Sequence, residues 1–325
     1  MNAAITGVWW AVKRAFRTVG LEISRYTEPP PVDNLSLAGP SNKLSVVPTP
    51  GGSVVPRPAP FVLVASNHGT LIVNRNDHSG PGQSGFGVGL QILTNSCFEN
   101  DEIRLALTLL CHRMKFYGPG VVAVDCGANL GVHTVEWARQ MSDWGTVIAL
   151  EAQERIFYSL CGNIAINNCM NVKAIWAAAS SKSGKMLIPI PDYNKPASYG
   201  SLELRQRDLP EFIGQEINYN TDACMEVETI SIDDLELKRL DFLKIDVEGM
   251  ETEVLSGAER SISTYKPIIM IEILKSKPSE IIDFLKKYDY QYHRFRGENL
   301  LAIHGLDPTQ AGISAVAGEL KVEPA

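Results

Sequence analysis

The sequence lacks the patterns by which a chain crosses a membrane, enters the secretory route or binds zinc. Its 325 residues contain no run of 18 or more apolar residues, which excludes an ordinary membrane-spanning helix. The basic residues near the N-terminus fall within the apolar stretch rather than before it, unlike a secretory signal. The six cysteines form no C-x-x-C pair and show no zinc-type spacing with the six histidines. Together these absences predict a reducing, cytoplasmic setting.

Basic residues are also fewer than acidic ones, 30 against 37. The formal net charge is -7, so no field of the whole chain attracts nucleic acid, and we predict no nucleic-acid partner. The apolar and charged fractions, 45% and 21%, are ordinary for a soluble globular protein. A chain of this length is expected to form one large α/β domain with additional N-terminal residues.

The first 60 residues differ from the rest. Apolar residues in 4–23 recur at spacings of three, four and seven, which predicts an amphipathic helix within residues 1–28. This helix could contact a membrane surface or a protein partner, or it could dock on its own domain or on a second copy in a homo-oligomer. Residues 29–60 are rich in proline, glycine and serine, and we predict an extended linker there.

Strand-like and helix-like segments then follow one another. In residues 61–119 we predict a hairpin, a glycine-rich loop at 79–89 and a helix at about 99–115. Residues 306–325 are predicted to be a C-terminal tail. Within 120–305 the predicted strands are 121–125, 146–150, 172–178, 241–246 and 267–273, the helices are 132–141, 154–168, 250–264 and 278–288, and 290–295 with 299–304 form an antiparallel hairpin. This alternation predicts an α/β fold with a doubly wound, mostly parallel sheet. Residues 184–231 interrupt it as a long insertion, to which we assign a substrate-shaping role.

The most informative segment is VVAVDCGANLGVHT, residues 121–134. An apolar strand leads into Asp125, and Gly127, Asn129 and Gly131 form a turn before the next helix. Such a turn lets the backbone approach a nucleotide closely. However, an acid at the strand end with G-x-x-x-G spacing does not match the G-x-G-x-x-G turn of a pyrophosphate site. The acid suits a ligand with positive charge, such as S-adenosyl-L-methionine, and so predicts methyl transfer.

The second strand ends at Glu151. Ligands of parallel sheets bind at the carboxyl ends of the strands, where an acid can accept hydrogen bonds from both ribose hydroxyls of an adenosine. Taken alone, Glu151 could also be a surface carboxylate at the start of a loop, although cofactor binding is the favoured interpretation. Its position after the glycine turn favours cofactor binding.

The fourth strand ends in DFLKIDVEGME. Lys244 and Asp246 share one face of this strand, and Glu248 follows in the turn. A lysine in an apolar strand needs a charged partner, so these residues either form a structural ion pair or place an acid beside the acceptor hydroxyl as a general base. Glu272 ends the fifth strand and could join Asp246 in binding a divalent cation, but no third ligand is apparent and we predict no metal. His133 could contact the ligand or cap the turn.

Several segments together resemble the FkbM-type family of S-adenosylmethionine-dependent methyltransferases, over about residues 92–305. They are VDCGANLGVHT, ALE at 149–151, GNIAINN at 162–168, VETISIDDL at 227–235, FLKIDVEGMETEVLSGA at 242–258 and KPIIMIEI at 266–273. The resemblance implies a seven-stranded Rossmann-like sheet and methylation of a hydroxyl, often on a sugar or other small-molecule or glycan acceptor. It also implies cofactor binding by Asp125, Gly127, Asn129, Gly131 and Glu151, and a transfer site at Lys244, Asp246 and Glu248.

Two other classes remain as alternatives. A dinucleotide-dependent oxidoreductase would share the sheet and the ribose acid, but the turn after the first strand lacks its glycine spacing. A methyltransferase fold kept as a non-catalytic binding or assembly module would use the N-terminal helix as its partner site. The intact acids at three strand ends favour an enzyme over such a module.

Overall fold

The computed structural model describes residues 58–80, 85–316 and 319–322. The predicted N-terminal helix and nearly all of the predicted linker therefore lie outside the described residues. Arg57–Ala325 forms one compact unit. Among the described residues, no helix combines the length and the apolar character needed to cross a bilayer.

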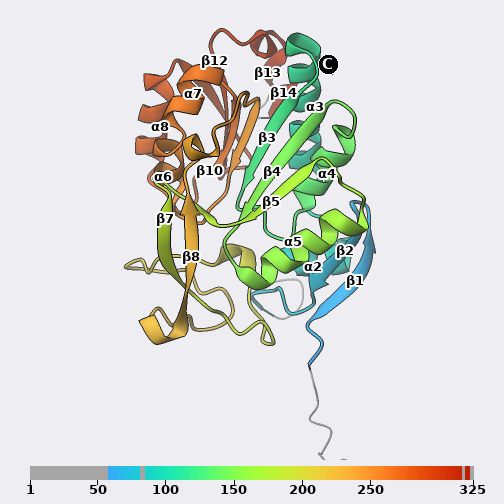
Figure 1. Cartoon of the computed structure of the whole chain (residues 1–325), viewed down its shortest axis with the longest axis vertical. Helices are drawn as coiled ribbons and strands as arrows, with labels where there is room; N and C mark the ends of the chain where they lie inside the picture. Colours follow the sequence, from blue (N-terminus) through green and yellow to red (C-terminus); the bar gives the residue numbers. More distant parts are fainter. Residues whose placement is uncertain (1–57, 81–84, 317–318, 323–325) are drawn as a thin grey trace, which may run out of the picture. The chain divides into compact units, whose positions relative to one another are not determined.

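Seven strands form the central sheet, in the order β11-β12-β10-β9-β3-β4-β5 (Figure 1). Neighbouring strands from β10 to β5 are parallel, whereas β12 is antiparallel to both β10 and β11. The strands are β3 (Val121–Cys126), β4 (Gly145–Glu151), β5 (Val172–Trp176), β9 (Phe242–Ile245), β10 (Ile268–Glu272), β11 (Tyr290–Phe295) and β12 (Asn299–His304). The predicted fold class, including the C-terminal antiparallel hairpin, is confirmed.

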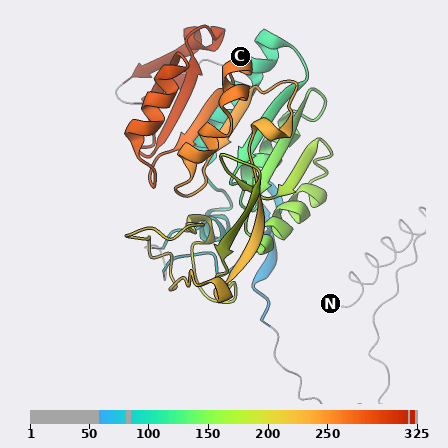
Figure 2. The same cartoon turned by 60° about the vertical axis from the view of Figure 1, so that its left-hand side comes forward.

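Helices cover both faces of this sheet, which explains why its strands are apolar on both sides. On one face, α3 (Asn100–Tyr117) and α4 (Val132–Gln140) pack on side chains such as Val121 and Phe242. On the other face, α6 (Glu251–Ser256), α7 (Glu259–Tyr265) and α8 (Pro278–Lys287) pack on side chains such as Leu243 and Ile269. Figures 1 and 2 show these two helical layers on opposite sides of the strands.

The helix predicted over 250–264 is broken in two at Gly257. A Cβ at this glycine would lie 2.2 Å from the carbonyl oxygen of Ser180, so the helix passes directly against another backbone segment. The carbonyl of Gly257 also accepts a hydrogen bond from the N–H of Asp233 (2.9 Å). Tertiary contacts thus divide a segment whose sequence periodicity predicts a continuous helix.

The ends of the 184–231 insertion are strands rather than loop. β7 (Gly184–Pro189) and β8 (Cys224–Ile230) form a three-stranded sheet with the short β6 (Ala178–Ala179). Between them, residues 190–223 contain two short 3₁₀ helices, Tyr199–Ser201 and Thr221–Ala223. Tyr199 is fully buried, and its N–H donates to Asp77 Oδ1 (3.0 Å). The middle of the insertion is therefore held against the N-terminal part of the domain.

The N-terminal hairpin, β1 (Phe61–Ser66) and β2 (Gly69–Asn74), docks on α5 (Glu154–Ile166). The amides of Asn163 and Asn167 hydrogen-bond to both backbone groups of Ile72 and of Thr70, respectively, as a neighbouring strand would. Asn163 is fully buried in this contact. A further helix, α2 (Val88–Asn95), begins inside the segment that we expected to be a glycine-rich loop.

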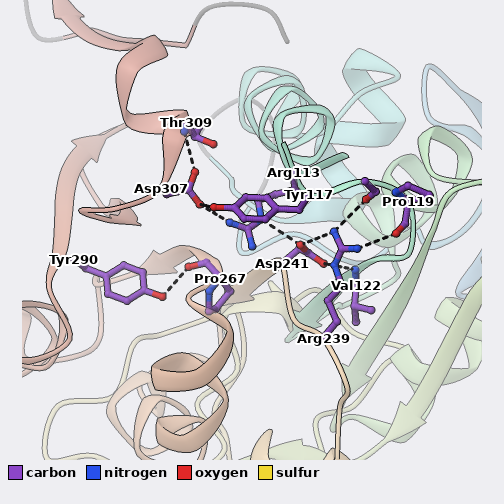
Figure 3. Close-up of polar contacts among 11 residues, drawn as sticks. Arg113, Tyr117, Pro119, Val122, Arg239, Asp241, Pro267, Tyr290, Asp307 and Thr309 are labelled. Atoms are coloured by element: carbon purple, nitrogen blue, oxygen red, sulfur yellow. Dashed lines mark hydrogen bonds and ion pairs between the residues drawn. The ribbon is translucent and has the colours of Figure 1, made fainter. Parts of the chain in front are cut away.

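A buried ionic network lies at the amino ends of the strands, at the opposite edge of the sheet from the predicted site (Figure 3). Arg113 of α3 pairs with Asp241 (3.2 Å) and with Asp307. Asp241 also accepts hydrogen bonds from the N–H of Val122 (2.9 Å) and from Arg239. These contacts join α3, the sheet and the C-terminal residues. Removing one partner from such a buried ionic network typically destabilises a protein by about 3–5 kcal/mol.

Candidate active site

The carboxyl ends of β4, β3, β9 and β10 bring the predicted acids together. In the sheet register, Asp125 lies beside Lys244 of β9. On β4, Asp125 pairs with Ala149, and Glu151 follows two residues later. On β10, Lys244 pairs with Met270, and Glu272 follows two residues later. Because side chains alternate along strands, these residues and Asp246 project toward one face of the sheet. It is the face covered by α3 and α4.

One cavity of about 230 Å³ opens at this edge. All eight residues predicted for cofactor binding or catalysis line it: Asp125, Gly127, Asn129, Gly131, Glu151, Lys244, Asp246 and Glu248. Residues from the insertion and from the segment before α3 complete its wall. The structure therefore assembles these residues in one place, whereas their individual roles remain predictions.

The turn after β3 has the left-handed backbone that its glycines suggest. Gly127, Asn129 and Gly131 have φ angles of 78°, 52° and 89°. A Cβ at Gly127 would lie 1.8 Å from the backbone oxygen of Asp246, so this glycine also allows the β3 and β9 turns to touch. One residue thus links the predicted cofactor turn to the predicted transfer site.

We expect Gly127→Ala to destabilise the fold by about 2–5 kcal/mol, the sum of left-handed strain and overpacking. The matched control is Gly297→Ala. Gly297 also has a positive φ (73°), but its added Cβ would meet nothing within 4 Å. The control should therefore lose only about 1–2 kcal/mol from backbone strain. Chemical denaturation measures both, and equal losses would show that the contact with Asp246 is unimportant.

Glu151 is buried and holds the glycine turn. Its two carboxylate oxygens accept hydrogen bonds from the N–H groups of Asn129 (2.9 Å) and Gln153 (2.7 Å). Each oxygen has a further lone pair for a ligand hydroxyl. Burial raises the pKa of Glu151 to about 7, although the backbone donors counteract part of this rise.

Asp125 is almost fully buried at the end of β3. Its Oδ2 accepts a hydrogen bond from Thr134 Oγ1 (2.6 Å), and its Oδ1 has no hydrogen-bond partner among the described residues. Burial raises the pKa of this carboxyl, while the nearby Lys244 lowers it. Asp125 lines the cavity, and a buried oxygen without a partner is rare in proteins, so Oδ1 is a candidate acceptor for a positively charged or hydrogen-donating ligand.

Lys244 and Asp246 form the ion pair that the sequence predicts. Lys244 Nζ donates to Asp246 Oδ2 at 2.8 Å. Burial by itself disfavours the ammonium, but Asp246, Asp125 and Glu102 raise its pKa overall. The Asp246 side chain remains one-third exposed (33%) to the cavity. A charged lysine thus holds a carboxylate that a substrate can reach.

Glu248 takes part in a second ion pair that was not predicted. Lys275 Nζ lies 2.6 Å from Glu248 Oε2 and 2.7 Å from Glu211 Oε2, and it donates to the carbonyl of Ser201 (2.8 Å). Burial and the neighbouring Asp246 raise the pKa of Glu248 to about 8. Lys275 therefore connects the end of the sheet to the insertion, and only its position shortly after the fifth strand could have suggested this.

The insertion forms part of the cavity wall. Ser198, Gly200, Ser201 and Leu202 all line the cavity. A Cβ at Gly200 would lie 2.7 Å from Asn129 Nδ2, so the insertion approaches the glycine turn closely. The aromatic residue Phe98, before α3, lines another part of the wall and was not predicted from the sequence.

The parallel sheet, the glycine turn and the cavity at the strand ends define a Rossmann-like cofactor-binding domain. The profile of the family described as the Methyltransferase FkbM domain matches residues 125–292, just over half of the chain. The chain therefore belongs to the FkbM methyltransferase family. This confirms the predicted family and, with it, S-adenosylmethionine as the cofactor.

Individual relatives are more distant. The methyltransferase sdnD of Sordaria araneosa is 25% identical over 155 residues, which are 42% of this chain and 60% of that protein. A solved structure of methyltransferase FkbM from Methylobacillus flagellatus KT is 18% identical with a TM-score of 0.39, covering 59% of this chain and 48% of that one. A methyltransferase from Geobacter sulfurreducens is 13% identical with a TM-score of 0.38, covering 66% and 85%. The chain thus spans less than two thirds of the first two relatives.

Proposed function

We propose that this protein transfers a methyl group from S-adenosylmethionine to a hydroxyl of a sugar, glycan or other small molecule. The observation that carries the proposal is the single cavity lined by both Glu151 and Asp246. These residues end strands that are two places apart in the sheet, which separates them by roughly 9–10 Å at ~4.8 Å per strand. One cavity can therefore hold the ribose at Glu151 and the reacting groups beside Asp246.

The cofactor-side residues act by position. Gly127, Asn129 and Gly131 let the backbone approach the cofactor, Glu151 accepts the ribose hydroxyls, and Asp125 faces the charged amino acid portion. When bound, the cofactor supplies an electrophilic methyl group on a sulfonium. Alignment with an acceptor oxygen can lower the barrier by ~7–11 kcal/mol without a covalent intermediate.

On the acceptor side, Asp246 accepts the proton of the hydroxyl. The acceptor oxygen forms its bond to the methyl carbon as the sulfur–carbon bond breaks, which leaves neutral S-adenosylhomocysteine and a protonated Asp246. Lys244 holds Asp246 in place through the 2.8 Å ion pair. Glu248 and Lys275 position the insertion over the acceptor through the contacts of Lys275 with Glu211 and Ser201.

Calorimetric titration with S-adenosylhomocysteine, with NAD in parallel, tests the first half of this proposal. We expect micromolar binding of S-adenosylhomocysteine and none of NAD. A subsequent screen of hydroxyl acceptors, beginning with sugars, tests transfer. Failure of S-adenosylhomocysteine to bind would refute our assignment of the strand ends, whereas binding without turnover on any acceptor would favour a non-catalytic module.

A further inference from the structure

A second group of potential ligand atoms lies beside the cavity and has no part in the transfer described above. Glu99 precedes α3, Glu102 lies in its first turn, and His133 lies in the first turn of α4. One carboxylate oxygen of each glutamate and one imidazole nitrogen of His133 all lie within 4.8 Å of one another. Three side chains from two helix starts thus converge on one point.

His133 is buried and incompletely satisfied. Its side chain is only 6% exposed, and Nε2 has no hydrogen-bond partner among the residues that the structure describes. Glu99 Oε2 is 3.7 Å away, which is beyond hydrogen-bonding distance. The ring stacks on Trp137 with an interplanar angle of 8°, which fixes its plane. Because a buried polar atom without a partner costs about 1–3 kcal/mol, this nitrogen calls for a ligand.

Glu102 is a second buried polar group with few interaction partners. It is 4% exposed, and within the described part of the chain it has one hydrogen bond, from Asn299 Nδ2 (3.0 Å), and no salt bridge. The nearby Lys244, which is bound to Asp246, and Arg296 compensate a charge on Glu102 only in part, because burial still raises its pKa. A buried carboxylate is strongly disfavoured without a compensating positive charge. A small void of about 10 Å³ borders Glu99, Glu102 and Lys244, but His133 does not line it.

We propose that Glu99, Glu102 and His133 bind one divalent transition-metal ion, of which Mn²⁺ and Zn²⁺ are the probes. Such ions lie ~2.0–2.2 Å from nitrogen and oxygen ligands, so ligands on opposite sides are separated by ~4.0–4.4 Å. Three ligands cannot all lie opposite one another, and in a tetrahedral set they are ~3.3–3.6 Å apart, so the observed atoms, all within 4.8 Å of one another, must approach by up to ~1.5 Å. A mixed set of imidazole and carboxylates favours these ions over Mg²⁺ and Ca²⁺, which prefer oxygen ligands alone.

This site adjoins the acceptor end of the cavity. Glu99 and His133 line the same cavity as Asp246. If an acceptor hydroxyl bound to an ion held by these residues, the ion would lower the pKa of that hydroxyl and ease loss of its proton to Asp246. This role rests on the proposed methyl transfer, whereas ion binding itself does not.

The test is calorimetric titration of the full chain, freed of metal with a chelator, with Mn²⁺ and separately with Zn²⁺. We expect one site per chain, with affinity lowered at least tenfold in Glu102→Gln and in His133→Gln. Asp101→Asn is the matched control. Asp101 lies in the same turn, but its side chain is 74% exposed and, among the residues that the structure describes, forms an ion pair with Arg296. It removes the same charge and should leave ion binding unchanged.

The proposal is wrong if neither ion binds the wild-type chain, or if the ligand variants bind like the control. Circular dichroism checks that the variants fold, and Glu99→Gln, at a side chain that is 30% exposed, replaces a ligand with less disturbance of the core. Titration of the same samples with S-adenosylhomocysteine separates the two proposals. Cofactor-product binding without metal binding overturns only the metal site, and the reverse result overturns only the assigned cofactor site.

Discussion

Asp246→Asn is expected to lower the rate of methyl transfer by about 10²–10⁴-fold, the usual contribution of a positioned general base. Asparagine keeps the shape of the side chain and an oxygen that can accept the hydrogen bond of Lys244, but it cannot take up the hydroxyl proton. Affinity for S-adenosylhomocysteine should stay within about threefold of the wild type. The measurements are single-turnover methyl transfer and calorimetry on the same sample.

Glu248→Gln provides the comparison that assigns the base. Glu248 is already paired with Lys275, although burial together with the neighbouring Asp246 raises its pKa to about 8. We expect this variant to raise KM for the acceptor more than it lowers kcat, because it loosens the contact between Lys275 and the insertion. Normal turnover in Asp246→Asn with loss in Glu248→Gln would move the base to Glu248.

The sheet and its strand ends could be predicted because their signals are local. A parallel strand buried on both faces is a short apolar run, so VVAVD and VIALE mark both the strands and the acids that end them. The hairpin at 290–295 and 299–304 was predicted with the bounds that the structure has. Because parallel strands have their carboxyl ends at the same side of the sheet, the sequence also predicts that these acids lie close together.

The remaining features depend on contacts between segments far apart in the sequence. The start of α2 depends on Asp77 Oδ2, which accepts the N–H of Gly89 (2.8 Å) and whose carboxyl also binds the insertion through Tyr199. The bridging role of Lys275 requires the insertion to lie beside it. Neither requirement leaves a periodic pattern in the sequence, so neither could be predicted from it.

Glu151→Ala is expected to weaken binding of S-adenosylhomocysteine by tenfold or more. Each hydrogen bond to a charged carboxylate contributes about 1.5–3 kcal/mol, and ~1.4 kcal/mol corresponds to tenfold in affinity. The substitution also removes the acceptor for the N–H groups of Asn129 and Gln153, so the turn itself loosens. Glu154→Ala is the matched control, because Glu154 begins α5 only three residues later and does not line the cavity.

The pH dependence distinguishes loss of the ribose contact from general loosening. Ribose hydroxyls donate to the ionised form of Glu151, whose pKa burial raises to about 7. At a pH below this value Glu151 is mostly protonated, and it must lose its proton before it can accept hydrogen bonds from both ribose hydroxyls. The affinity of the wild-type protein for S-adenosylhomocysteine should therefore rise as the pH increases from 6 to 8. Glu151→Gln cannot ionise and should bind weakly with no such rise. A wild-type profile that is flat over this range, or a rise that persists in Glu151→Gln, would place the ribose elsewhere in the cavity.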